Sequence, residues 1–153
     1  MSKLFSRERE QGQSLVEFAL CLPIMLLIVT GITSFGITMN QYLMLTNATN
    51  SAARQLAFSH GLTTDPCALA ANTVYGAAPF LKTSSLTFSF VFNGTTYNGA
   101  SCSSTSTTTG AAGNLAQNST AKIVVTYPCV LQVYNKNVLP GCVLTAQDSE
   151  LVE

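Results

Sequence analysis

Four cysteines lie in the last two thirds of the sequence, and their number indicates disulfide chemistry. Four cysteines in a small domain with a thin apolar core are typical of two disulfides formed in an oxidising compartment. The alternative is a set of reduced, buried thiols in a cytosolic domain. Three pairings are open. The pair Cys129–Cys142 is favoured because it closes a short loop through Pro140-Gly141, and it leaves the pair Cys67–Cys102.

The other reactive side chains are too few for a catalytic or metal site. His60 is the single histidine, and we expect it at the surface, capping the last carbonyls of a helix. Asp65 suits a helix N-cap, and the acids after it fall in the last six residues. No C-x-x-C pair, phosphate-binding loop or dinucleotide fingerprint is present in the sequence. We therefore expect no enzyme activity, no metal, no cofactor and, with zero net charge and no basic cluster, no nucleic-acid partner.

One acid, Glu17, stands near the start of the longest apolar stretch. Residues 13–39 are almost wholly apolar, and residues 18–53 carry no charge. Such a run exceeds the ~20 residues that a helix needs to cross ~30 Å of hydrocarbon. We expect a transmembrane helix over residues 13–39, inserted in the lipid bilayer, with Cys21 as inert packing inside it.

The basic residues predict the orientation of this span. Lys3, Arg7 and Arg9 precede it, and the next basic residue is Arg54. Positively charged flanks stay in the cytoplasm, so residues 1–12 form a cytoplasmic leader, flexible or a frayed helix start. The C-terminal domain then lies outside, which agrees with its cysteines.

Residues 40–60 should continue the helix as an amphipathic stalk. Apolar residues repeat there at intervals of three and four, namely Tyr42, Leu45, Ala48, Ala52 and Leu56, with Ala53 and Phe58 beside them. His60-Gly61 should end the helix. From Ser14 to Ser59 it would measure about 70 Å at 1.5 Å per residue.

Residues 61–153 predict a small disulfide-tied α+β head with one further helix and a short antiparallel sheet. The helix covers Cys67–Ala77, with Thr64 or Asp65 as N-cap and Leu69, Ala70, Val74 and Ala77 on one face. Alternating apolar residues predict strands at 85–92 and 120–127, and Asn93-Gly94 predicts a hairpin to a return strand at 95–97.

The remaining segments of the head give weaker patterns. Residues 100–113 are polar and of low complexity, so we expect a mobile loop tethered by Cys102. Residues 130–134 fit a further strand or an apolar patch near the membrane. Residues 143–146 fit an edge strand, and residues 148–153 a tail.

The first sixty residues resemble the TadE-like family, minor pseudopilins of tight-adherence (Flp, type IVc) pilus systems. That family combines a basic leader ending in Gly, an acid five residues later, an apolar run with a Pro, and a small-residue helix ending in Ala-Ala-Arg. The matching residues are Arg9, Gly12, Val16, Glu17, Phe18, Ala19, Pro23, Gly31, Phe35, Gly36, Leu45, Asn47, Ala48, Ala52, Ala53 and Arg54.

This resemblance implies a structural role and a set of partners. A prepilin peptidase would cut between Gly12 and Gln13, and Glu17 would meet the new ammonium group of a neighbouring subunit. Other partners would be pilin or pseudopilin subunits, contacted through the N-terminal helix, and an inner-membrane assembly platform. The head would lie in the bacterial periplasm or on a surface pilus.

Two plainer interpretations stay open. Glu17 could sit in the headgroup layer at the start of a helix, where the helix dipole favours an acid. The whole chain could be an uncleaved, single-pass binding or adhesion module, anchored in the membrane with its head outside the cytoplasm.

Overall fold

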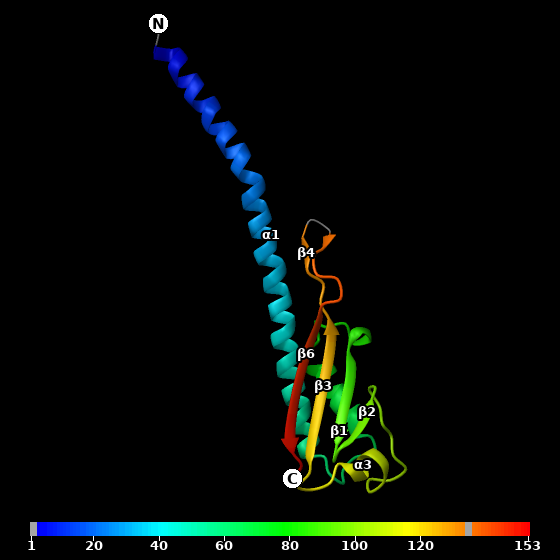
Figure 1. The fold of residues 1–153 in the computed structure, drawn as a ribbon. Coiled ribbons are helices and arrows are strands. Elements are labelled where there is room, and N and C mark those ends of the chain that lie inside the picture. Colours follow the sequence, from blue (N-terminus) through cyan, green and yellow to red (C-terminus); the bar gives the residue numbers. More distant parts are fainter. Residues whose placement is uncertain (1–2, 134–135) are drawn as a thin grey trace.

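The computed structural model describes the backbone of residues 3–133 and 136–153, and the side chains from residue 13 onward within those ranges. Met1 and Ser2 of the predicted leader, and Tyr134 of the predicted segment 130–134, lie outside the described residues. The predicted α+β class is confirmed: a long helix, a further helix and a small antiparallel sheet follow one another. Figure 1 shows the sheet beside the C-terminal part of the long helix, whose N-terminal part projects alone.

The long helix, α1, covers Lys3–Ala57 without interruption and passes through Pro23. At 1.5 Å per residue it is about 80 Å long. It begins earlier than predicted, because the leader from Lys3 onward continues the same helix. It ends three residues before His60, and Gly61 follows with a φ of +72°, a conformation that glycine adopts without strain.

The C-terminal third of α1 carries the head. Leu45, Ala48, Ala52 and Leu56 are fully buried, so most of the predicted stripe is confirmed. Tyr42, which was predicted to begin the stripe, is exposed. The buried stripe therefore starts at Leu45, and its alanines let the head approach the helix backbone closely.

The second helix, α2, covers Pro66–Ala77 and packs against α1. Asp65 is its N-cap, as predicted, and its side chain accepts a hydrogen bond from the Ala68 backbone. Of the predicted face, Ala70 and Val74 are buried, whereas Leu69 is half-buried and Ala77 is exposed. The other buried side chains of α2 are Pro66, Cys67 and Ala71.

Four strands form one antiparallel sheet in the order β2-β1-β3-β6. Their bounds are β1 Thr87–Phe92, β2 Thr95–Asn98, β3 Thr120–Pro128 and β6 Val143–Leu151. The predicted hairpin joins β1 to β2 through Asn93 and Gly94, whose φ angles are 47° and 80°. Positive φ at both turn positions is the requirement of the tight hairpin turn that Asn-Gly favours.

Alternate side chains of β1 and β3 fill the core between the sheet and the two helices. Phe88, Phe90 and Phe92 of β1 lie against Ile123 and Val125 of β3, and all five are buried. A short 3-10 turn, η1 Thr83–Ser85, leads into β1, so the first strand starts two residues after the predicted position.

Two predictions for the head are wrong. Residues 148–153 are not a tail, because β6 runs to Leu151 along the whole of β3, and Val152 is fully buried. The segment 100–113 is not entirely loop, because a short helix, α3 Gly110–Asn114, ends it and buries Ala111 and Ala112. In both segments the contacts come from backbone pairing or from small side chains.

A separate two-stranded ribbon, β4 Gln132–Val133 and β5 Lys136–Asn137, lies between β3 and β6 in the chain. It extends beyond the end of the four-stranded sheet and runs beside α1 (Figure 1). The predicted strand at 130–134 is thus present in shortened form, in a sheet of its own.

Candidate functional site

The exposed N-terminal part of α1 is the most unusual surface of the chain. Every described side chain from Gln13 to Val29 is exposed, and nearly all are apolar. In the part of the chain that the structure describes, α1 is the one helix long and apolar enough to cross a membrane. The head covers none of this surface, so it is free to contact lipid or other apolar helices, which is consistent with a single-pass membrane protein.

The predicted cleavage position lies inside this helix. Gly12 and Gln13 are both helical, and the side-chain amide of Gln13 donates a hydrogen bond of 3.4 Å to the Glu17 carboxylate, one turn later. The two residues therefore share one side of the helix. Cleavage at this bond, and the part of Glu17 in assembly, stay predictions.

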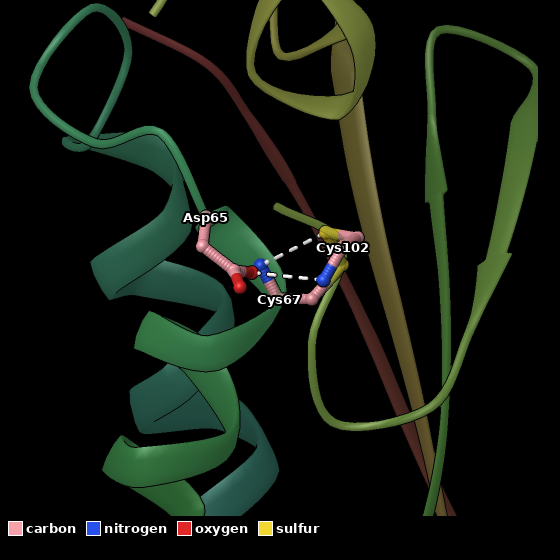
Figure 2. Close-up of side chains that lie close together, drawn as sticks. All are labelled: Asp65, Cys67 and Cys102. Atoms are coloured by element: carbon pink, nitrogen blue, oxygen red, sulfur yellow. Dashed lines mark hydrogen bonds between the residues drawn. A yellow bond between two sulfur atoms is a disulfide. The ribbon is translucent and has the colours of Figure 1, made fainter. Parts of the chain in front are cut away.

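A second polar cluster ties the start of α2 to the loop that follows β2 (Figure 2). One oxygen of Asp65 accepts hydrogen bonds of 2.9 Å from the backbone N–H groups of both Ala68 and Cys102. The other oxygen accepts from the Ser101 hydroxyl. Asp65 thus caps a helix and holds a loop 36 residues later in the chain, and we call this cluster the Asp65 clamp.

Opposing effects act on the acidity of the Asp65 carboxyl. Burial raises its pKa, but hydrogen bonds from Ser101, Cys102, Ala68 and Cys67 stabilise the charged form, so that the pKa lies below its ordinary value of 3.8. The carboxylate is therefore ionised throughout the neutral range. Both of its oxygens accept hydrogen bonds, so the carboxylate has a structural role: it holds the start of α2 against residues 101–102.

A disulfide strengthens the same junction. Cys67, the second residue of α2, pairs with Cys102, and their Cα atoms are 5.4 Å apart. The Cys67 backbone N–H also points at the Cys102 sulfur, at 3.2 Å. The second disulfide joins Cys129 to Cys142, with Cα atoms 5.2 Å apart, and closes the base of the β4–β5 ribbon. These are the pairs that the loop through Pro140-Gly141 favoured.

The side chains at the clamp also have the spacing of a metal site. Ligand atoms of Asp65, Cys67 and Cys102 all lie within 4.8 Å of one another. Zinc binds cysteine as the thiolate, and the disulfide leaves neither sulfur as a thiolate. The geometry therefore fits a covalent cross-link with a carboxylate cap better than a metal centre.

His60 is exposed, as predicted, but the prediction that it caps the last carbonyls of α1 is wrong. Its Nδ1 donates a hydrogen bond of 2.6 Å to the carbonyl oxygen of Leu115, just after α3. The backbone N–H of Glu153 also bonds to the carbonyl of Ala57, at 3.0 Å. The last residue of α1 is thus bound to the predicted tail, and His60, just after α1, is bound to a residue that follows the predicted loop.

Sequence reasoning found the caps and the cysteines but missed how they combine. Asp65 has the pattern of an N-cap, and this local signal says nothing about Ser101 or Cys102. The ribbon position also carried no clear signal, because β4 and β5 are two residues each. In both cases the missing information is the three-dimensional approach of segments far apart in the sequence.

Among the comparisons with known proteins, one gives a match, and it is to a family model. No curated protein and no solved structure matches the chain. A family model described as TadE-like protein matches residues 12–54, which begin at the predicted cleavage position and end at Arg54. This range covers the bare part of α1 and most of the stalk. The match confirms the predicted resemblance, in that residues 12–54 are similar to the TadE-like family.

Proposed function

We propose that this protein is a minor pseudopilin-like subunit of a tight-adherence pilus or a related secretion system. The observation that carries the proposal is the bare apolar surface from Gln13 to Val29, which belongs to the segment matched by the TadE-like family model. Such a helix can serve twice, first as a bilayer anchor and then as the surface on which neighbouring subunits pack.

In this proposal the span lies in the bacterial inner membrane, with the leader in the cytoplasm. Lys3, Arg7 and Arg9 precede the span, and positively charged flanks favour the cytoplasmic side. The two disulfides support an oxidising compartment for the head, which is the periplasm. The chain is then a structural component and a substrate of the prepilin peptidase, and has no enzyme activity of its own.

Cleavage after Gly12 would give Gln13 a free ammonium group. Glu17 lies one helical turn away and accepts a hydrogen bond from the Gln13 side chain. In an assembly, the carboxylate of one subunit can meet the ammonium of the next, and a buried pair of this kind fixes register more than it adds stability. The partners are the peptidase, other pilin or pseudopilin subunits, and an inner-membrane assembly platform.

The test is to express the full chain with and without a prepilin peptidase of a tight-adherence system, and to measure the intact mass of the membrane-extracted protein. We expect loss of residues 1–12 only when the peptidase is present, and an N-terminus at Gln13. G12L should block the mass change. E17L should be cut normally but fail to co-purify with other pilin subunits.

A matched control removes an acid on the other side of the cut. E10L makes the same chemical change as E17L, within the segment that cleavage discards, and it should leave both cleavage and co-purification unchanged. An intact leader in the presence of active peptidase would refute processing. It would favour the uncleaved binding or adhesion module, whose activity should survive replacement of Ser14–Met39 by an unrelated membrane anchor.

A further inference from the structure

The end of the head that faces the projecting part of α1 carries several exposed apolar side chains. Phe80, in the loop after α2, is 83% exposed. The β4–β5 ribbon and its flanks add four more side chains that are each more than half exposed, namely Val130, Val138, Leu139 and Val143. We call these five residues the membrane-facing end.

Two contacts fix the position of this end along α1. The Ser34 hydroxyl donates a hydrogen bond of 2.6 Å to the carbonyl of Gln132 in β4. Phe80 lines a shallow hollow together with Ile37, Asn40 and Met44 of α1. The membrane-facing end therefore lies level with residues 34–44 of the helix, on the side of the head toward the bare apolar section (Figure 1).

The length of the span places the same level at a bilayer surface. Twenty residues at 1.5 Å each cover about 30 Å, the thickness of the hydrocarbon. Counted from Ser14, that thickness ends at Thr33, so the last six residues of the predicted span 13–39, which begin at the contact of Ser34 with β4, fall in the interfacial layer. A ribbon with exposed backbone at its rim does not enter hydrocarbon, so the interfacial layer is the depth that suits it.

The charged residues of the head also differ between its two ends. The basic residues Lys82 and Lys136 are exposed and lie close to Phe80 and to the ribbon. The acids Asp148 and Glu150 lie on β6 opposite Ile123 and Ala121, toward the far end of the sheet. Asp65 and Glu153 also lie at that far end, beside the start of α2 and the end of α1. Lys122 on β3, opposite Ser149, is the one basic residue of the described head that lies near these four acids. In the described part of the head, the far end is thus acidic on balance, whereas the membrane-facing end is basic and apolar, which suits anionic lipid headgroups.

We propose that the membrane-facing end rests in the headgroup layer of the bilayer that α1 crosses, with Phe80 and the apolar ribbon side chains inserted at the level of the upper acyl chains. The Cys129–Cys142 disulfide closes the ribbon at its base, and the Val138 N–H bonds to the Leu131 carbonyl at 2.8 Å. These links keep the ribbon formed when its outer side chains enter the interface. The head would then be held against the membrane at a fixed tilt before any assembly step.

This inference rests on the membrane insertion of α1 proposed above, and is independent of cleavage and of filament assembly. The chain contains no tryptophan, so a single introduced tryptophan reports its own surroundings without background. The experiment uses the full chain reconstituted in phosphatidylcholine–phosphatidylglycerol vesicles, with bromine atoms placed either high or low on the acyl chains as contact quenchers of fluorescence.

Three variants make the comparison. F80W tests the membrane-facing end, and L26W lies in the middle of the span. F58W is a matched control, because Phe58 is also well exposed but directly follows the C-terminal end of α1, far from the span. We expect shallow bromines to quench F80W at least twofold more strongly than F58W. L26W should be quenched most by deep bromines. L139W should repeat the F80W result for the ribbon.

Each outcome decides the question. If L26W is quenched but F80W and L139W behave like F58W, α1 spans the membrane and the proposed resting surface is wrong. If L26W is not quenched either, the membrane insertion itself is refuted, and this inference falls with it. If F80W resists both quenchers while its emission shifts with the protein-to-lipid ratio, a second copy covers this end and the lipid contact is refuted.

Discussion

Replacing Asp65 with alanine is the sharpest test of how the head is held together. The change removes a helix N-cap, which costs about 1 kcal/mol of folding free energy. It also removes the acceptor for the Cys102 N–H and the Ser101 hydroxyl, and each such hydrogen bond contributes about 0.5–1.5 kcal/mol. Together these losses amount to about 2–4 kcal/mol. For a domain the size of this head, they lower the Tm by about 10–30 °C.

The asparagine variant separates the contributions at the same position. The side chain in D65N keeps one oxygen that can accept from both Ala68 and Cys102, and asparagine caps helices about as well as aspartate. We expect the decrease in Tm caused by D65N to be less than half of the decrease caused by D65A. E153A is the control, because Glu153 is an exposed acid whose backbone N–H, rather than its side chain, bonds to α1.

Lowering the pH should reduce the difference in Tm between the wild type and D65A. The pKa of the folded Asp65 lies below 3.8, so its charge stabilises the folded state fully above the unfolded-state pKa. This stabilisation is lost as the pH falls through the lower, folded-state pKa. The difference in Tm should therefore be constant near neutral pH and shrink below about pH 4.

The assay is thermal unfolding of the full chain in detergent micelles, without reductant, followed by near-ultraviolet circular dichroism of the tyrosines. This signal reports the head, where Tyr75, Tyr97 and Tyr127 lie in or against the core, rather than the bare part of α1. If D65A unfolds within 3 °C of E153A, the clamp contributes nothing measurable and the reasoning from its hydrogen bonds is wrong.

Three further predictions use the same unfolding measurement. Truncating the buried Phe90 in F90A should cost about 3–5 kcal/mol, and a loss under 1 kcal/mol would show that the aromatic row does not carry the core. G76A, in an exposed turn of α2, should stabilise by about 0.5–1 kcal/mol, whereas G94A, at a φ of +80°, should destabilise by about 1 kcal/mol; equal effects would contradict the turn assignment. V152A should cost about 1.5–3 kcal/mol while the exposed L151A costs under 1 kcal/mol, and the reverse order would restore the tail interpretation.

The strands that were predicted well are those whose side chains alternate strongly. In β1, Phe88, Phe90 and Phe92 point into the core and the residues between them do not, so the period of two in the sequence is the period of burial. The same holds for β3. The Asn-Gly turn between β1 and β2 could be predicted because its positive φ angles restrict which residues fit.

The last strand could not be predicted in full, for a physical reason. In β6 only Ala146 is buried, and Asp148 and Glu150 stand on the strand. What holds this strand is its backbone ladder with β3 and its contact with α1, and neither leaves an apolar pattern in the sequence. Charged side chains on an edge strand also discourage pairing with other chains. Asp148 and Glu150, which obscured the strand pattern in the sequence, therefore suit a strand at the edge of the sheet.

The short helix α3 was missed for a related reason. Its core side chains, Ala111 and Ala112, are small and follow a run of serine and threonine. Low complexity is typical of loops, and the packing of this segment appears only in three dimensions, where Ala111 joins the core and the neighbouring Leu115 accepts the hydrogen bond from His60. The proposed cleavage site differs, because the sequence pattern of Gly12, Gln13 and Glu17 is local and its prediction needs no contact between distant segments.

The one-sided attachment of the head limits how copies of this chain can gather. The head lies against the last third of α1, its ribbon reaches Ser34, and the section from Gln13 to Val29 is left open on all sides. If such sections associate in parallel, every head comes to the same end of the cluster and is forced to its periphery, since the axis is occupied by helices. Even a pair of such chains would then have two different ends, a wide one that carries the heads and a narrow one made of helices alone.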